Sequence, residues 1–372
     1  MSERPWIPDR MLLFSVIGLL SIGFLSLYSV YMGQAYAGLI PSIASEMVTY
    51  LLGLGLGIVA AFVVSKAPVS FYKKISYPLY FVSIVLLALV FIYPNVSHHR
   101  WIYVGGYSFQ PSELAKLAMV LVSAHYLSEN DASQMNFKQI LTLLLMFALV
   151  GFLVILEPDF STSVMLLVIF VMQYFLSGAR VWILWVLFGI FGLGVVVQSL
   201  VDSSMWKARI IAVLDPINTH SWEAEHLRNS LVAIAGAGFF GKGLFQGQSK
   251  FTPKVFAIES DFIFANIVEE LGFLGAMVVI ALFIVFVFAA IKIASRSKNQ
   301  FAYLVALGIA LHLGMQAFFN IGVVIGLLPS TGVTLPFVSA GSTSLIVNLV
   351  EVGILFGIDR HSHQRKTLEV GG

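Results

Sequence analysis

Asp261, Glu269 and Glu270 stand in an otherwise apolar stretch, DFIFANIVEELGFLG, at residues 261–275. A carboxylate at the edge of an apolar region can act as a base if partial burial raises its pKa. Asp261 could equally cap a helix that begins near Phe262. Glu269 and Glu270 would then lie about 12 Å deeper at 1.5 Å per residue. Charge is costly at that depth, so we expect both to line a cavity or face other helices.

A second charged group occurs in FQPSELAKLA, residues 109–118. Pro111 predicts the first position of a helix. Glu113 and Lys116 share a face at i, i+3, and a pair between them lowers the cost of placing charge in a membrane helix. The spacing leaves a structural pair and a functional pair both open.

Glycines 236, 238, 241 and 243 in AGAGFFGKGLFQG imitate a dinucleotide fingerprint. That motif needs a preceding strand and a following helix, and neither is predicted here, so we expect no nucleotide. The glycines instead predict tight turns, or a close approach of backbone to the membrane surface or to a ligand.

The segment NIGVVIGLLPSTGVTLPFVSAGSTS, residues 320–344, is uncharged and is broken by proline and glycine. Irregular backbone at a membrane face is tolerated where it is buried in protein or lines a cavity. The segment is therefore either a re-entrant loop or a tight connector. Ser339 and Ser342 are its candidate cavity-lining residues.

The elements that carry these groups are predicted to be membrane helices. The chain is 59% hydrophobic and 11% charged, with mean hydropathy +0.92, whereas globular chains are about 25% charged. It has no cysteine, which excludes disulfides and thiolate metal sites. The net charge of +2, without a basic cluster, gives no indication of nucleic-acid binding.

We predict an all-α polytopic membrane protein with about ten transmembrane helices, since about 20 apolar residues cross a bilayer. The expected spans are 11–33, 43–65, 76–95, 111–128, 138–156, 161–178, 181–201, 262–291, 301–328 and 341–358. The distribution of Lys and Arg places both termini in the cytoplasm and a large extracytoplasmic loop, residues 202–260, between the seventh and eighth helices. We treat residues 1–372 as one membrane domain with a cytoplasmic tail at 359–372.

Several segments, in the same order, resemble the SEDS family (shape, elongation, division and sporulation) of FtsW and RodA. They are RWIYVGGYSFQPSELAKLA, EPDFSTS, RIIAVLDP, NSLVAIAGAGFFGKGL, ESDFIFANIVEELGFLG and NIGVVIGLLPSTGVTLPFVSAGSTSLIVNL. The match runs from about residue 100 to 350. Ala340 and Ser342 stand where Tyr and Gly are common, which puts in doubt any precise role for that loop.

The resemblance implies a peptidoglycan glycosyltransferase that polymerises lipid II at the outer face of the cytoplasmic membrane. It implies that Asp261 is essential and that Glu113 and Lys116 are functionally important. The expected partners are a class B penicillin-binding protein, whose transpeptidase cross-links the glycan, and other divisome proteins. RIIAVLDP and GLLPSTGVTLPF look closer to the division member FtsW than to the elongation member RodA. The alternatives are a RodA-like polymerase, a lipid II flippase and a non-catalytic scaffold.

Sugar transfer from a polyprenyl diphosphate needs a base for the acceptor hydroxyl, and Asp261 is the candidate. It also needs positive charge for the departing pyrophosphate. That charge could come from a divalent metal ion, Mg or Mn, or from basic residues of the long loop. The candidate basic residues are Arg209, Arg228, Lys242, Lys250 and Lys254.

Overall fold

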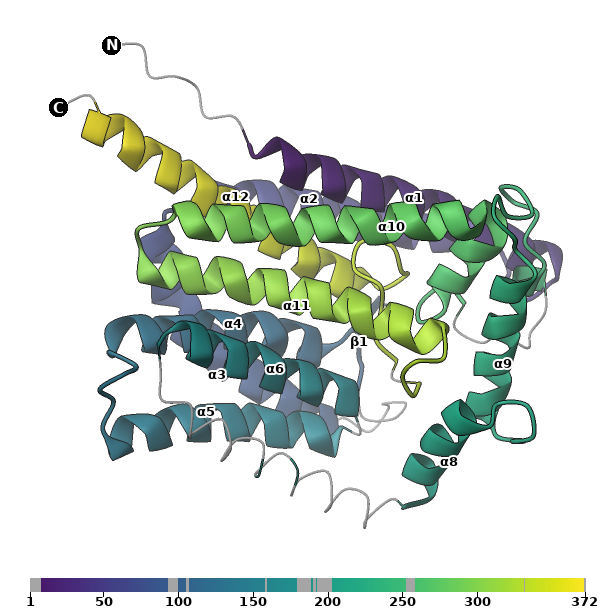
Figure 1. Cartoon of the computed structure of the whole chain (residues 1–372), viewed down its shortest axis with the longest axis horizontal. Coiled ribbons are helices and arrows are strands. Elements are labelled where there is room, and N and C mark those ends of the chain that lie inside the picture. The colour runs from purple at the N-terminus through teal and green to yellow at the C-terminus, as the bar shows by residue number, and fades with distance from the viewer. Residues whose placement is uncertain are drawn as a thin grey trace.

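The structure is a computed structural model that describes residues 8–92, 100–104, 107–157, 159–178, 189, 192, 203–251, 258–330 and 332–370. Long helices lie side by side in a bundle, and shorter helices lie across one end of it (Figure 1). The helices are α1 (Arg10–Tyr36), α2 (Ile43–Ser65), α3 (Val69–Ile92), α4 (Pro111–Glu129), α5 (Phe137–Leu156), α6 (Phe160–Leu176), α8 (Ser203–Leu214), α9 (Trp222–Ala235), α10 (Ile263–Arg296), α11 (Gln300–Val324) and α12 (Ser342–Val370). A short 3-10 turn, η2, spans Ser249–Phe251.

The all-α polytopic membrane fold is confirmed. Within the described residues, seven helices are long and apolar enough to cross a membrane, namely α1, α2, α3, α5, α10, α11 and α12. Helix α4 has 19 residues but carries charge, and α6 has only 17. The predicted span 181–201 lies almost entirely outside the described residues, so the number ten stays a prediction, as does the single-domain organisation.

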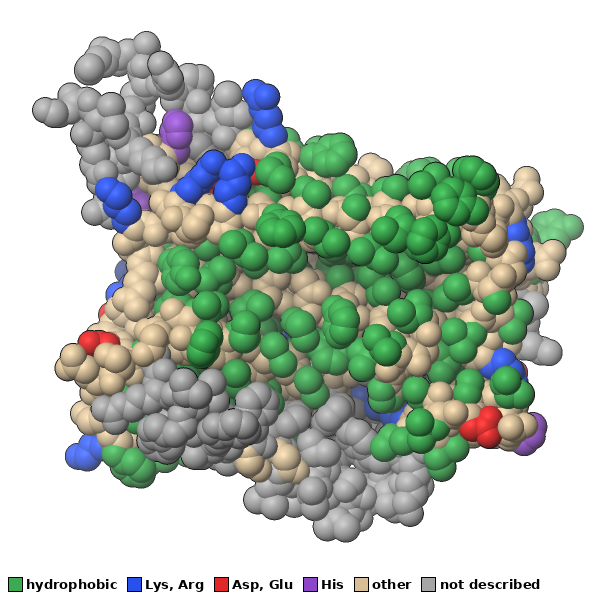
Figure 2. Space-filling model, viewed as in Figure 1, with side chains coloured by type: hydrophobic (Ala, Val, Ile, Leu, Met, Phe, Trp, Pro, Cys, Tyr) green, Lys and Arg blue, Asp and Glu red, His purple; other side chains and the backbone are tan. Residues whose placement is uncertain are grey.

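Burial separates lipid-facing helices from central ones. Only 22% of the apolar part of α2 is buried, against 67% of α11 and 78% of α12. Figure 2 shows hydrophobic side chains over the middle of one face, with Lys and Arg side chains near its two ends. This is the pattern of a bundle whose sides meet lipid and whose ends meet water.

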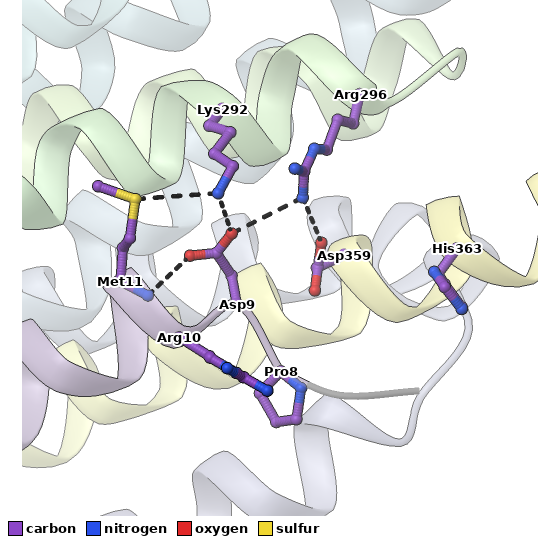
Figure 3. A pocket seen from close by; sticks show the side chains of 8 residues that line it. All are labelled: Pro8, Asp9, Arg10, Met11, Lys292, Arg296, Asp359 and His363. Atoms are coloured by element: carbon purple, nitrogen blue, oxygen red, sulfur yellow. Dashed lines mark hydrogen bonds and ion pairs between the residues drawn. The ribbon is translucent and has the colours of Figure 1, made fainter. Parts of the chain in front are cut away.

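Both ends of the described chain lie at one end of the bundle, where an ionic cluster joins three helices (Figure 3). Asp9 caps α1 by accepting from the Met11 and Leu12 amides, and it accepts from Lys292 Nζ of α10 at 2.8 Å. Arg296 of α10 lies 3.7 Å from Asp9 Oδ2 and 3.9 Å from Asp359 Oδ1 of α12. Burial raises the pKa of Asp9, but its bonds from Lys292 and the amides outweigh burial and hold it below its usual value. The cluster therefore fixes α1, α10 and α12 relative to one another.

Helix α12 continues as far as Val370, through the residues predicted as a tail. The segment 359–370 contains neither proline nor glycine, so nothing in it breaks the helix. The predicted span and its tail are thus one helix in the structure.

The opposite end of the bundle, called here the loop end, carries α8, α9 and a strand pair. Strand β1 (Ile102–Val104) pairs antiparallel with β2 (Tyr107–Phe109), with Ile102 opposite Phe109. Thr343 at the start of α12 donates to the Ser108 carbonyl at 3.1 Å and accepts from the Gln110 amide at 3.3 Å. These bonds fix the hairpin directly before α4, and Pro111 occupies the first turn of α4 as predicted.

Helix α10 is broken at Gly272, where φ is 70° and ψ is −166°. The glycine loop 238–243 lies against this break and supplies the hydrogen bonds that a continuous helix would have made. The Phe273 and Leu274 amides donate to the carbonyls of Gly238 and Phe239, at 3.1 and 3.2 Å. In return, the Lys242 and Gly243 amides donate to the carbonyls of Glu269 and Glu270, at 2.9 and 3.0 Å. The glycines thus bring the loop backbone against the backbone of α10, a partner that was not predicted.

This contact predicts that Gly241→Ala is far more harmful than Gly238→Ala. Both glycines have positive φ, at 79° and 66°, which costs an alanine roughly 1–2 kcal/mol. A Cβ at Gly241 would also lie 2.2 Å from the Glu270 carbonyl oxygen, whereas one at Gly238 meets nothing within 4 Å. The clash adds roughly 1–3 kcal/mol or more. Thermal unfolding of both variants in detergent checks this, and equal losses would contradict it.

Candidate functional site

Asp261 lies in a turn at the loop end, directly before α10, and its side chain is half-buried. Its backbone carbonyl accepts a hydrogen bond from Asn320 Nδ2 of α11 at 2.8 Å. Phe262 is the residue that caps α10, and no side-chain hydrogen bond is made at this cap. The interpretation of Asp261 as an N-cap is therefore wrong, and its carboxylate faces other neighbours.

Arg100 is the cation that faces Asp261. The two side chains meet across Gly332, whose φ of +72° favours glycine. A Cβ built at Gly332 would lie 3.5 Å from Arg100 Nη1 and 3.7 Å from Asp261 Oδ2. A Cβ at position 332 would thus be in van der Waals contact with both charged groups, and the positive φ would strain any residue other than glycine.

The environment of Asp261 moves its pKa into the range useful for a base. Burial is the main cause and raises the pKa to about 6, while the charge of Arg100 opposes it. The nearby charges of Glu259 and Asp159 raise the pKa further, and a hydrogen bond with Ser260 lowers it. The carboxylate is thus largely ionised at neutral pH and still basic enough to accept a proton.

Glu157, after α5, sits behind Arg100 and is fully buried. Neither of its carboxyl oxygens has a hydrogen-bond partner among the described residues. Burial and the charge of Asp159 raise the pKa of Glu157 to about 9, despite Arg100. Arg100 Nε donates instead to the Glu157 backbone carbonyl at 3.0 Å. The guanidinium is thus oriented by a backbone carbonyl, and its charge acts on Asp261.

Asp159 closes this side of the site as the N-cap of α6. It accepts from the Thr162 amide at 3.2 Å and from the Thr162 hydroxyl at 2.9 Å. An aspartate directly before a helix is a common cap, and Asp159 fills that role here. The cap fixes the start of α6 beside Glu157 and Arg100.

The segment between α11 and α12 folds into the bundle, as expected for irregular backbone buried in protein. Its apolar side chains at Leu335, Phe337 and Val338 are at most 1% exposed. Ser339 Oγ donates to the Ser260 carbonyl at 2.5 Å and accepts from the Leu335 amide at 2.8 Å. The Ala340 amide donates to the Glu259 carbonyl at 2.7 Å. The loop is therefore bonded along its length to the turn that holds Asp261.

Glu113 and Lys116 form a buried ion pair in α4. Lys116 Nζ lies 2.8 Å from Glu113 Oε1, and the lysine side chain is 1% exposed. Lys116 also donates to Gln316 Oε1 of α11 at 3.0 Å. The pair thus exists as the spacing allowed, and it reaches across to a helix that holds the site.

Glu269 and Glu270 lie in α10 directly before its break at Gly272. Glu269 accepts from Lys242 Nζ at 2.7 Å and from the amides and hydroxyl of Gln248 and Ser249. Glu270 accepts from Lys250 Nζ at 2.7 Å, from Ser29 of α1 at 2.6 Å, and from the loop amides of Phe245 and Gly247. Of the two expected surroundings, another helix is met at Glu270, and both acids fasten the outer loop to α10.

The basic candidates for pyrophosphate are spread apart. Lys242 and Lys250 are matched by Glu269 and Glu270, and Lys250 is 1% exposed. Arg209 lies on α8, and Arg228 on α9 donates to the Ile217 carbonyl at 3.4 Å, which closes the turn between these helices. Lys254 lies outside the described residues. The structure brings none of the four described candidates to Asp261 by a recorded contact, so their role stays a prediction.

An apolar cavity of about 590 Å³ opens between α2, α4 and α12, beside strand β2. Ser342 lines it at the end that also carries Thr49, Ser108 and Thr343, and leucines, isoleucine and valines line the rest. A pocket of this size and character suits a hydrocarbon chain with a polar group at one end. Ser339, in contrast, contacts the Asp261 turn.

Carboxylates that could hold a metal are not gathered in the described part of the chain. No group of three or more His, Asp or Glu side chains there has a metal-binding arrangement. Near Asp261, the Glu259 carboxylate accepts from Gln34 Nε2 at 2.9 Å and Asp159 is used as a helix cap. One or two carboxylates together with substrate phosphates can also hold Mg, so a bound Mg or Mn ion stays a prediction.

Comparison with known proteins decides the family. Residues 10–364 match the family model described as a cell cycle protein, FtsW, RodA and SpoVE. The chain belongs to this family. The assignment agrees with the SEDS resemblance of the sequence motifs, and it covers nearly the whole chain.

Three family relatives illustrate the match. Stage V sporulation protein E of Bacillus subtilis is 34% identical over 97% of this chain and 100% of its own length. The probable peptidoglycan glycosyltransferase FtsW of Nitrosococcus halophilus is 33% identical over 95% of this chain and 92% of its own. A chain of a peptidoglycan synthase complex, studied for its coordination of polymerization and crosslinking, superposes with a TM-score of 0.76 and 27% identity, covering 96% of this chain and 100% of that chain.

Within this family fold, sequence reasoning did not select Arg100, Glu157 or Gly332 as site residues. Arg100 differs from the other basic residues in one respect. It is the one Lys or Arg that the predicted topology places on the extracytoplasmic side in a connection other than the long loop 202–260. Glu157 is in a matching motif, but its turn chemistry explained it without a site. Arg100 is 161 residues and Glu157 is 104 residues before Asp261 in the sequence. Nothing in the sequence indicated that these residues lie close to Asp261 in the fold.

Proposed function

We propose that this protein polymerises lipid II into glycan strands at the outer face of the cytoplasmic membrane, as a peptidoglycan glycosyltransferase. The observation that carries the proposal is the half-buried Asp261 carboxylate, with a raised pKa, facing Arg100 across Gly332. The family and the names of its relatives support the reaction class.

Asp261 acts as the general base in this proposal. It accepts the proton of the acceptor sugar hydroxyl as that oxygen attacks the anomeric carbon of the donor. The bond between that carbon and the diphosphate oxygen breaks, and its electron pair leaves with the polyprenyl diphosphate. A single displacement opposite the leaving group inverts the anomeric centre, so an α-linked donor gives a β-linked strand.

Arg100 stabilises the departing diphosphate. Its guanidinium lies beside the reacting carboxylate, and its Nε is held by the Glu157 backbone carbonyl, so the group is preorganised. A planar guanidinium also matches phosphate oxygens in a bidentate arrangement. In this proposal, Arg100 supplies the positive charge for the diphosphate that was expected from basic residues of the long loop.

The apolar cavity between α2, α4 and α12 accommodates a lipid tail of the substrate. Its polar end, at Ser108, Ser342 and Thr343, lies at the loop end, where these residues also fix the hairpin that follows Arg100. A lipid-linked sugar could thus place its chain in the bundle and its headgroup beside Asp261.

A class B penicillin-binding protein is the proposed partner, as expected from the resemblance. The similar chain from a peptidoglycan synthase complex supports this assembly. The orientation with both termini in the cytoplasm is part of the same proposal, because it puts the loop end and Asp261 outside.

Replacement of Asp261 tests the proposed base. Asp261→Asn keeps the shape and removes the proton acceptor, so polymerisation of lipid II by purified protein with its transpeptidase partner should fall by at least about 100-fold. Asp215→Asn is the matched control, since Asp215 lies in a surface turn and bonds to Asn218. Glycan chains are measured on gels. Polymerisation by Asp261→Asn at the wild-type rate excludes Asp261 as the base.

The pH dependence tests the facing cation. Activity needs ionised Asp261, so kcat/KM of the wild type should rise with pH through about 6. Arg100 lowers the pKa of Asp261 by its charge, so Arg100→Met should move this rise to higher pH, whereas Arg100→Lys should leave it near its wild-type position. If the rise of kcat/KM with pH occurs at the same pH in Arg100→Met as in the wild type, Arg100 does not act on the pKa of Asp261.

We place the protein in septal wall synthesis within this family. The support is the two FtsW-like motifs and the relatives named FtsW, although the sporulation protein of Bacillus subtilis matches equally well. Expression in a bacterium depleted of its own FtsW should restore septation. Expression under RodA depletion should not restore rod shape, and the reverse pattern would assign the protein to elongation.

A further inference from the structure

A stripe of three polar side chains runs along the buried face of α11. His312, Gln316 and Asn320 are spaced four residues apart, so they point to the same side of the helix. Their exposures are 0, 0 and 1%. Polar groups so buried are costly unless hydrogen-bonded, so their partners indicate what the stripe holds together.

Gln316 bonds to two different parts of the protein. Its Oε1 accepts from Lys116 Nζ at 3.0 Å, and its Nε2 donates to the Thr334 carbonyl and hydroxyl, both at 3.1 Å. The lysine can only donate and the carbonyl can only accept, so the orientation of the amide is fixed by chemistry. One side chain thus joins the Glu113–Lys116 pair to the loop after α11.

Asn320 makes the second connection one helical turn further along. Its Nδ2 donates one hydrogen to the Asp261 carbonyl and the other to the Val333 carbonyl, both at 2.8 Å. An amide nitrogen has two hydrogens, and both are used. Asn320 therefore ties the Asp261 turn to the loop residue between Gly332 and Thr334.

Together these bonds make a continuous path from α4 to Asp261. Lys116 bonds Gln316, Gln316 bonds Thr334, and Thr334 is covalently joined to Val333. Val333 is then bonded through Asn320 to Asp261. Gly332 lies near both Arg100 and Asp261 and directly precedes Val333 in the chain. The bond from Asn320 to Val333 therefore also fixes Gly332.

We propose that Gln316 and Asn320 are positioning residues, and that the Glu113–Lys116 pair acts on the reaction through them and not by contact with substrate. The inference rests on the proposed function of Asp261. Lys116 fits this role because it is 1% exposed and its ammonium is already bonded to Glu113 and Gln316. Loss of either tie would leave the pair intact but release Gly332 and Asp261 from their fixed geometry.

Two substitutions of Gln316 separate its two links. Gln316→Met removes both. Gln316→Glu keeps an acceptor for Lys116, but an ionised carboxylate cannot donate to Thr334. Since a displacement of about 1 Å at a reacting group can cost about 100-fold, both variants should lose about that much in kcat for lipid II polymerisation. KM should stay within about twofold, as for an interaction made only in the transition state.

His312→Gln is the matched control on the same stripe. His312 bonds Glu351 of α12 at 2.8 Å and has no recorded contact with the loop or with Asp261. Glutamine can still donate to Glu351, so this variant should retain wild-type kcat. A rise in KM without loss of kcat in Gln316→Glu, or an equal loss of kcat in His312→Gln, overturns the proposal.

A double-mutant cycle tests whether Lys116 acts through Gln316. If it does, Lys116→Met with Gln316→Met should lose no more kcat than the worse single variant, because the path is broken once. In the double variant Lys116→Met with His312→Gln, the fold-loss in kcat should equal the product of the losses in the two single variants. Losses that multiply in the Lys116 and Gln316 pair show independent roles and overturn the proposal.

Amide hydrogen exchange gives a readout that does not depend on activity. In Gln316→Met and in Asn320→Leu, the amides of Leu335, Ser339 and Ala340, which bond within the loop and to Glu259, should exchange faster than in the wild type. The His312→Gln control should not change them. If wild-type protein with its partner fails to polymerise lipid II, the proposed function is wrong. If amide exchange is unchanged in both Gln316→Met and Asn320→Leu, the positioning role is wrong, whatever the outcome for the function.

Discussion

Two carbonyl oxygens, those of Asp261 and Val333, accept both hydrogens of one amide nitrogen on Asn320. Neither carbonyl belongs to a helix, so neither has a partner within regular secondary structure. A buried backbone group without a hydrogen bond is costly, and α11 supplies the partner here from the polar side chains on its buried face. This requirement for backbone partners governs the irregular segments around the site.

The same requirement is met differently at Gly272. There the break in α10 leaves amides and carbonyls without helical partners, and a glycine loop from the outer segment inserts its backbone to satisfy them. Glycine is needed on both sides, because a Cβ at Gly241 or Gly272 would lie 2.2 to 2.3 Å from the facing backbone. The two carboxylates before the break, Glu269 and Glu270, then bind the lysines and amides of the same loop. An outer loop and a membrane helix thus become one unit next to the site.

Much of this could be predicted from sequence where the signal is local. Span 43–65 matches α2, Pro111 opens α4, and the i, i+3 spacing of Glu113 and Lys116 gives the ion pair seen in the structure. The break at Gly272 and the lysine partners of Glu269 and Glu270 could not be predicted, because glycine is common in membrane helices and nothing in EELGFLG marks Gly272 as a break. Arg100 and Gln316 were missed because their roles depend on residues far away in the sequence. Arg100 faces Asp261, 161 residues later, and Gln316 bonds Lys116, 200 residues earlier. Hydrophobic patterning reports which face of a helix is buried and does not report which distant residue it meets.

The acids of the segment 259–270 show how position decides chemistry among similar side chains. Glu269 and Glu270 are at most 2% exposed and are each paired with a lysine at 2.7 Å, so both carboxylates are engaged in structural contacts. Glu259 is engaged by Gln34. Asp261 is half-buried and raised in pKa, it faces a guanidinium across a glycine, and its carboxylate makes a hydrogen bond with Ser260. A base must be able to change its protonation state while a substrate is present. The Asp261 turn is held by the bond that its backbone carbonyl accepts from Asn320, so the position of the residue does not depend on the protonation state of its carboxylate.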